Sequence, residues 1–240
     1  MPNVSENIDG GNPAGGEQSL SGDLGDLCLL ASEQLQDTIP GENIGLNWPP
    51  SKMIPYLTLF ILETINLKPE AYPVEEPISL VAGAKQSLGA TDIALLDSLY
   101  NITGSGTTQV IVAPTITLIK KKAMDYALPG WPVFPAATLV NFIVKDDDNP
   151  YTFYTYPPND GTGKVLLLVS QPPPAITTDT TELPFDDSYK PACVDYLVYR
   201  CLSEETTVPG AQAKASTYYN KYLQHLGLKS NVEKQTAAKE

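Results

Sequence analysis

The segment from Ser188 to Leu228 constrains the fold most, because its pattern predicts two helices separated by a break at Pro209-Gly210. Apolar residues of the first helix fall on two neighbouring sides and form one broad face, with Arg200 as one cation along it. These residues are Cys193, Val194, Leu197, Val198, Cys201 and Leu202. The narrower stripe of the second helix consists of Tyr219, Tyr222, Leu223 and Leu226, with Gly227 at the usual C-cap position. Such a hairpin cannot bury its apolar face alone, so another part of the chain must pack on it.

Two stretches near the N-terminus can provide that packing partner. Residues 24–35 place Leu24, Leu27, Cys28, Ala31 and Leu35 at helical spacing, which predicts a first helix. From Tyr56 to Leu67, apolar residues occupy most of the circumference of a second predicted helix, which indicates a buried helix. Pro55 either opens this helix or kinks its first turn. Residues 1–21 are rich in Gly, Asn, Ser and Glu, and we expect them to form a mobile arm.

Between these helical parts, the pattern changes to short strands bounded by turn signals. Strands are predicted at Pro77–Val81, Gln86–Leu88, Val110–Ile119, Ala136–Val144, Thr152–Tyr156 and Lys164–Ser170. The segment 92–101 fits a strand or a helix, and periodicity alone does not decide between them. Residues 120–127 predict one or two helical turns, and the prolines at 172–174 end the strand region because they cannot donate to a sheet.

The predicted fold class is therefore α+β: a helical bundle built from N- and C-terminal helices, with an inserted small antiparallel β domain. The expected boundaries are 1–21 for the arm, 22–70 together with 186–228 for the bundle, and 71–185 for the β-rich insertion. Residues 229–240 are too polar to fold alone, and we expect them to form an extended C-terminal tail.

Composition excludes several classes of protein. The formal net charge of −13 argues against a protein that binds nucleic acid, because affinity for a phosphate backbone requires clustered Lys and Arg. No membrane span or signal peptide is predicted, since the longest apolar stretch, Ile54–Leu62, is far too short. Cys28, Cys193 and Cys201 form no CxxC pair, so we interpret them as small core residues of a protein made in a reducing cytoplasm.

No catalytic or metal-binding constellation stands out, and we predict no enzyme activity, no metal and no cofactor. His225 is the only histidine, and its position suits a helix C-terminus better than a charge relay. Asp146–Asp148 do not alternate as calcium ligands do, which favours a solvated turn, and Lys120–Lys122 favour local salt bridges. Paired carboxylates of a hydrolase remain open in any acidic chain. Tyr151, Tyr154 and Tyr156 are typical of core or interface packing, with sugar stacking as the other interpretation.

Three blocks of the sequence, in order, resemble the head-to-tail adaptor (connector) proteins of tailed bacteriophages with podovirus-like genomes. The first block, Trp48 to Ile102, has a helix opened by Trp48, then a short strand, an L-x-x-G turn at Leu80–Gly83 and a Q-x-L step at Gln86–Leu88. The second has P-x-W at Pro129–Trp131 and then D-x-x-N-P-x-x-F-x-x-Y-P-P from Asp146 to Pro158. The third is Y-x-x-A-x-x-D-x-x-x-Y-R from Tyr189 to Arg200, followed by a partner helix.

This resemblance implies a structural virion protein that is assembled in the cytoplasm of the host bacterium. Such adaptors form a dodecameric ring beneath the portal protein, extend the DNA channel and dock the tail nozzle or tail fibres. Viral DNA would pass through the lumen without specific binding. The helical part would form the ring and contact the portal, the β domain would face outward or toward the tail, and the C-terminal tail would reach into the portal. The residues proposed for the ring or portal interface are Arg200, Tyr218, Tyr219, Tyr222, Lys229, Lys234 and Glu240. The alternative is a carbohydrate-binding or host-adsorption module that uses the β domain.

Overall fold

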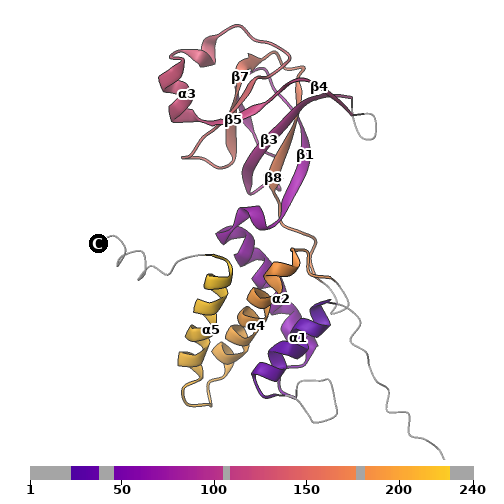
Figure 1. Ribbon diagram of the computed structural model, residues 1–240, viewed down its shortest axis with the longest axis vertical. Helices are drawn as coiled ribbons and strands as arrows, with labels where there is room; N and C mark the ends of the chain where they lie inside the picture. The colour runs from indigo at the N-terminus through magenta and orange to yellow at the C-terminus, as the bar shows by residue number, and fades with distance from the viewer. Residues whose placement is uncertain (1–22, 38–45, 105–108, 177–181, 228–240) are drawn as a thin grey trace, which may run out of the picture.

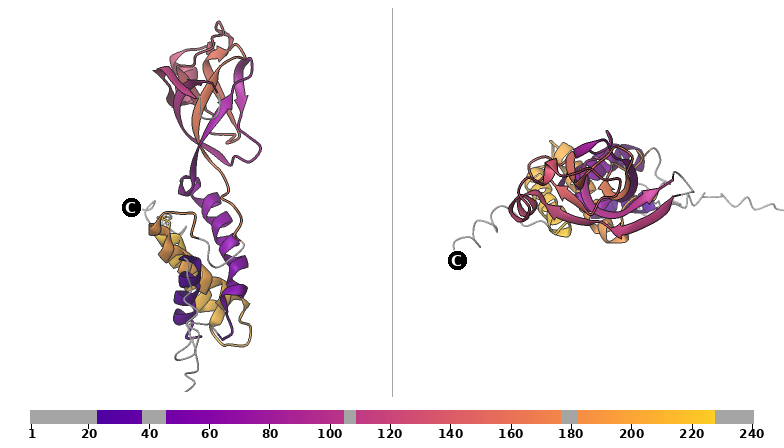
Figure 2. Two further views of the ribbon diagram at one scale, coloured as in Figure 1. Left: turned by 90° about the vertical axis from the view of Figure 1, so that its right-hand side faces the viewer. Right: turned by 90° about the horizontal axis from the view of Figure 1, so that it is seen from above.

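The computed structural model describes residues 23–37, 46–104, 109–176 and 182–227. The molecule is elongated, with four helices at one end and the strands at the other (Figure 1). The chain passes between these two parts twice, once from helix α2 (Pro50–Leu67) into strand β1 (Pro73–Ser79) and once from strand β8 (Lys164–Ser170) toward helix α4 (Lys190–Glu204) (Figure 2). The expected arm 1–21 and the expected tail 229–240 lie outside the described residues.

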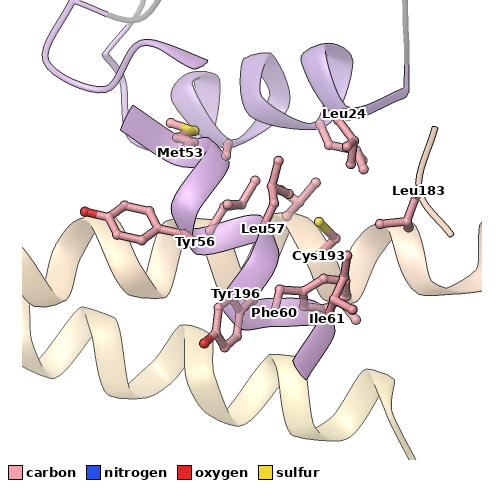
Figure 3. Close-up of a cluster of buried hydrophobic side chains, with 14 of the residues drawn as sticks. Leu24, Met53, Tyr56, Leu57, Phe60, Ile61, Leu183, Cys193 and Tyr196 are labelled. Atoms are coloured by element: carbon pink, nitrogen blue, oxygen red, sulfur yellow. The ribbon is translucent and has the colours of Figure 1, made fainter. Parts of the chain in front are cut away.

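The four helices at one end share a single apolar core. They are α1 (Asp23–Gln34), α2 (Pro50–Leu67), α4 (Lys190–Glu204) and α5 (Ala211–His225). Helix α4 is central, because it contacts each of the other three. Leu24 of α1, Phe60 of α2 and Cys193 of α4 meet in the core (Figure 3). The two N-terminal helices therefore pack on the C-terminal hairpin, as their apolar patterns predict.

Helix α2 differs from its predicted form in where it begins and in how far it is buried. It begins at Pro50, in the first helical position, where the missing N–H of proline is tolerated. Pro55 lies inside the helix. The prediction that α2 is buried is confirmed for the side that packs in the core, but Leu59, Leu62 and Leu67 are 40%, 45% and 39% exposed. Within the described residues, α2 packs chiefly on α4 and α1, so its remaining side stays open to solvent.

The strands form two four-stranded sheets, ordered β1-β8-β3-β4 and β2-β7-β6-β5. Their bounds are β1 Pro73–Ser79, β2 Gly83–Ser87, β3 Ala94–Thr103, β4 Val110–Thr115, β5 Thr117–Lys120, β6 Phe142–Lys145, β7 Thr152–Asn159 and β8 Lys164–Ser170. Residues 94–103 are thus a strand, which decides between the two interpretations of that segment. An apolar core that includes Leu95, Phe153 and Leu167 joins residues from both sheets.

Three predicted strand features need correction. The β-branched run 110–119 is two strands in different sheets, β4 and β5. The predicted strand 136–144 is reduced to β6, preceded only by an isolated bridge between Ala137 and Asn159. The sheets are not wholly antiparallel, since β5 and β6 pair in parallel. The short helix α3 (Lys121–Ala127) connects those two strands and ends before Pro129-Gly130, as predicted. The fold class is α+β.

Candidate functional site

A cluster of tyrosines fills the space between α2 and the α4–α5 hairpin. The rings of Tyr196 and Tyr222 lie 5.1 Å apart between centroids, and both contact Phe60 of α2. Nearer to the surface of the bundle, the ring centroids of the half-buried Tyr199 and Tyr219 lie 4.9 Å apart. Tilted and edge-on contacts of this kind stabilise a pair by about 1 kcal/mol beyond the apolar area that it buries. The hairpin and α2 are therefore joined mainly through aromatic rings.

Glu63 of α2 anchors the outer edge of this cluster. Its two carboxylate oxygens accept hydrogen bonds from the hydroxyls of Tyr196 at 2.9 Å and of Tyr219 at 2.8 Å. Burial, together with these bonds to a carboxylate, raises the pKa of Tyr219 to about 12 and that of Tyr196 still further. Both phenols therefore remain protonated donors at any physiological pH, and the contacts between α2 and the hairpin do not depend on pH near neutrality.

Arg200, the only arginine in the chain, lies beside this cluster on α4. Its guanidinium carbon is 5.4 Å from the centroid of the Tyr56 ring and 6.0 Å from that of Tyr199. The hydroxyls of Tyr56 and Tyr196 point to the same side of the bundle (Figure 3). Among the described residues Arg200 forms no ion pair, and its Nε is buried without a hydrogen-bond partner. The Tyr56 and Tyr199 rings therefore hold the guanidinium of Arg200, whose Nε makes no hydrogen bond within the described chain.

These side chains form one continuous surface with the exposed part of α2. Leu59 lies one turn after Tyr56 and one turn before Glu63, and it is 40% exposed. We name the surface made by Leu59, Glu63, Tyr199, Arg200 and Tyr219 the α2–α5 face. Exposed apolar side chains that are rimmed by polar ones are typical of protein interaction sites. Sequence reasoning missed Leu59, because the apolar pattern of α2 gave no sign that one side lacks a neighbour.

Among the described residues of the predicted interface, Tyr218 and Tyr222 do not join this face. Tyr222 is fully buried, with its hydroxyl 3.2 Å from Thr64 Oγ1, so within this chain it is a core residue rather than a surface one. Tyr218 lines a different depression, together with Leu35 and Leu202. Lys229, Lys234 and Glu240 lie outside the described residues. Of the described members of the predicted set, Arg200 and Tyr219 thus lie on the α2–α5 face, and the Tyr219 ring contacts that of Tyr222 beneath it at 5.7 Å.

A comparison with protein families identifies the family to which the chain is similar. The family model described as SU10 adaptor protein, a family of phage head-to-tail adaptors, matches residues 23–239. The chain belongs to this family. The match includes all four bundle helices and both sheets, and it confirms the resemblance seen in the sequence. None of the curated proteins compared with the chain matches it. Membership identifies a bacteriophage adaptor, a structural component of the virion.

The single histidine of the adaptor pairs with a buried carboxylate. His225, the last residue of α5, places Nε2 3.1 Å from Oδ2 of Asp195, whose side chain is largely buried. Burial raises the pKa of the Asp195 carboxyl, although His225 and Lys221 act to lower it. Because its pKa is higher in the folded than in the unfolded protein, this carboxyl binds a proton more tightly when folded. Its ionisation therefore costs stability, and the cost appears as pH rises through the raised pKa.

Asp195→Asn is accordingly expected to raise the midpoint of thermal unfolding of the adaptor at pH 7. The gain should shrink on acidification to about pH 3, where the carboxyl is already protonated in both states. Calorimetric scans of both proteins at the two pH values measure this difference. A lower midpoint for the variant at pH 7 would show that the ion pair with His225 outweighs the cost of burial.

In the β part of the adaptor, two lysines lie close to carboxylates. The Lys121 ammonium lies 3.0 Å from Asp125 Oδ2, and that of Lys120 lies 3.9 Å from Asp147. The hydrogen bond from the Trp131 indole, followed by that from Lys121, lowers the pKa of Asp125. Among the described residues, no group of three or more His, Cys, Asp or Glu side chains has the arrangement needed to hold a metal ion.

The aromatic and sulfur-containing residues singled out in the sequence are used mainly for packing. Tyr154 contacts the Trp131 ring at 5.7 Å, and Tyr156 packs against Phe142 and Phe134. Of the three tyrosines 151, 154 and 156, only Tyr151 is largely exposed. All three cysteines of the adaptor are buried. Over the described ranges, no helix has the length and apolar character needed to cross a membrane.

Proposed function

We propose that this adaptor forms a homo-oligomeric ring, dodecameric in the virion, beneath the portal protein. The ring extends the DNA channel and docks the tail nozzle or tail fibres. The family match over residues 23–239 carries this proposal. The net charge of −13 supports a lumen through which viral DNA passes without specific binding, because an acidic wall repels phosphate. The proposed role is structural and needs no enzyme activity, cofactor or membrane.

Within this ring, we assign separate roles to the parts of the chain. Residues 22–70 and 186–228 form the bundle that builds the ring and contacts the portal, and residues 71–185 form a β domain that faces outward or toward the tail. The separate apolar cores of the helices and the sheets support this division. Residues 229–240, with Lys229, Lys234 and Glu240, extend toward the portal. The protein is made in the cytoplasm of the host bacterium, to which its buried cysteines are suited.

The α2–α5 face is our candidate for a contact between neighbouring copies. Leu59 contributes apolar area that water otherwise covers, and Arg200 contributes a fixed cation without an ion-pair partner among the described residues. Tyrosine and arginine are among the residue types that contribute most to binding at interfaces, and the buried centre of an interface is more apolar than its rim. The helical part therefore presents the composition that a subunit contact requires.

Purified virus particles test the proposed role directly. A ring adaptor must occur in particles at twelve copies for each portal ring, and it must remain attached to the portal when tails are removed. Quantitative mass spectrometry of intact and tail-free particles measures both. Absence from particles contradicts the adaptor role. A copy number of only a few per particle contradicts the proposal that the adaptor forms a ring.

Leu59→Asp is expected to reduce incorporation into particles by about tenfold or more, while the free protein keeps its native melting temperature. A carboxylate replaces apolar contact at the proposed interface, and one buried unpaired charge removes several kcal/mol of binding free energy. The matched control is Val133→Asp, an equally drastic change at an 87% exposed site in the β part. If both variants are incorporated equally, the α2–α5 face is not a subunit contact.

No observation favours the alternative of a sugar-binding β module. Such a site needs exposed aromatic rings beside convergent polar groups in a depression. The described depression in the β part is instead lined by Lys121, Lys122, Asp125 and Asp146–Asp148 and has no aromatic wall. Of the three tyrosines that suggested stacking, Tyr154 and Tyr156 are engaged with Trp131, Phe134 and Phe142, and only Tyr151 is largely exposed.

A further inference from the structure

A groove runs over α4 between the end of α1 and helix α5, on a different side of the hairpin from the residues of the α2–α5 face. It has a volume of about 400 Å³. Its apolar lining comes from Leu35, Val198, Leu202 and Tyr218. A second depression of about 240 Å³ shares Leu35 and Leu202 with it, extends toward Trp48 and Val208, and is also lined by Asp37 and Glu205, so the site for negative charge is the first groove. The combined size suits several side chains of a peptide.

The edge of this groove is positively charged, in contrast to the chain as a whole. Lys214 and Lys221 both line it from α5, two turns apart. The ammonium of Lys221 lies 4.4 Å from the centroid of the Tyr218 ring, and both lysines are exposed. No described carboxylate lies within 4.0 Å of either ammonium. An occupant with apolar side chains and negative charge is therefore complementary to the groove.

The first 22 residues of the chain have this chemistry. They contain Glu6, Asp9 and Glu17 and neither lysine nor arginine. Val4 and Ile8 stand four residues apart next to the first two acids, so one short segment carries both apolar and acidic groups. The C-terminal segment 229–240 does not match, because its three lysines outnumber its two glutamates. Charge complementarity thus selects the N-terminal segment over the C-terminal one.

The segment also has the length required. It joins the chain at Asp23, the first residue of α1, and the groove begins at the other end of this 12-residue helix. That helix is about 18 Å long, whereas 22 extended residues span up to about 70 Å. A tethered segment also binds at an effective concentration that reaches the millimolar range, so modest contacts suffice.

We propose that residues 1–22 bind in the groove between α1, α4 and α5 of their own chain, with Val4 and Ile8 on Leu35, Leu202 and Tyr218, and with Glu6 and Asp9 at Lys214 and Lys221. The segment covers an apolar surface of the free adaptor that would otherwise be open to other chains. This proposal does not depend on ring formation, because the groove and the segment belong to one molecule.

Photo-crosslinking of the full-length chain at low concentration tests the proposal. A photoreactive amino acid placed at Ile8 is expected to give products of monomer mass, with the crosslinks at residues 34–36, 198–202 and 214–221. Mass spectrometry of the digested products locates them. Crosslinks spread over the β part and the bundle without preference overturn the proposal, and so do products formed mainly between two copies.

Charge exchange supplies the second arm of the experiment. Lys214→Glu with Lys221→Glu is expected to lower the crosslinking yield about fivefold or more, and adding Glu6→Lys with Asp9→Lys should restore most of it. The matched control, Lys85→Glu with Lys122→Glu, makes the same change at two exposed lysines of the β part and should leave the yield unchanged. Failure of the exchange to restore the yield overturns the assignment of the charged contacts. Circular dichroism spectra of all variants verify that each is folded.

Discussion

Replacing Leu197 with Asp is expected to abolish folding of the helical part. Leu197 lies in the middle of α4, the helix that contacts the other three, and its side chain is fully buried. An unpaired carboxylate at such a site costs several kcal/mol or more, in addition to the lost packing of the leucine. A domain has only about 5–15 kcal/mol of total stability, so the substitution removes most or all of it. Far-UV circular dichroism during heating measures the outcome as lost helix signal and a missing cooperative transition.

Two companion variants separate the effect of position from that of chemistry. Leu197→Met keeps the volume and apolar character of the side chain and should cost less than about 1.5 kcal/mol. Leu59→Asp introduces the same charge on α2 at an exposed site and should leave the melting temperature near that of the native protein. A native melting temperature for Leu197→Asp would contradict the placement of Leu197 in the core.

The bundle helices were predictable because each has apolar residues at helical spacing. All four bundle helices lie within a few residues of their predicted positions, apart from the early start of α2 at Pro50. How far each helix is buried was less predictable, as the exposed leucines of α2 show. Periodicity reports how many sides of a helix are apolar, but it does not report how many neighbours will cover them. Leu59 and Leu62 remain exposed because no described helix packs on that side.

Strand positions were predicted less well, since strand pairing depends on residues far away in the sequence. The run 110–119 consists mostly of β-branched residues, and apart from Pro114 nothing in it indicates that it leaves one sheet and enters the other near Ile116. The parallel pairing of β5 with β6 follows from the intervening helix α3, which returns the chain to the same end of the sheet. The sheet membership and pairing direction of such short strands could therefore be assigned only from the structure.

The candidate surface was predictable only in part. Arg200 and Tyr219 both contact the Tyr199 ring because α4 and α5 form the predicted hairpin. Tyr218 and Tyr222 differ from Tyr219 by one and three positions, yet one lines a groove and the other is buried. Neighbouring residues of a helix point in different directions, about 100° apart, so a tyrosine-rich stretch does not form a single surface. The face of each tyrosine depends on the placement of α1 and α2 around the hairpin.

Between the two sheets, Asn101 provides a polar connection that no sequence motif indicates. This residue of β3 is fully buried. Its side-chain NH₂ donates to the carbonyl oxygens of Pro114 at 2.9 Å and of Val140 at 2.8 Å, and its Oδ1 accepts from the Val140 N–H at 2.9 Å. One amide thus satisfies three backbone groups in the segments that lead out of β4 and into β6.

Asn101→Ala is therefore expected to destabilise the β part by several kcal/mol, because it leaves the two buried backbone groups of Val140 without partners at about 1–3 kcal/mol each and also removes the bond to the Pro114 carbonyl. Urea unfolding followed by tryptophan fluorescence measures the loss, since Trp131 is buried in the same part of the molecule. Asn101→Asp keeps the size of the side chain but replaces its donor with an acceptor that faces two carbonyls, so it should be nearly as harmful. The matched control is Asn141→Ala at an exposed neighbour of Val140, which should change stability by less than about 0.5 kcal/mol. A mild effect of Asn101→Asp beside a severe effect of Asn101→Ala would mean that side-chain volume, rather than hydrogen bonding, makes this position important.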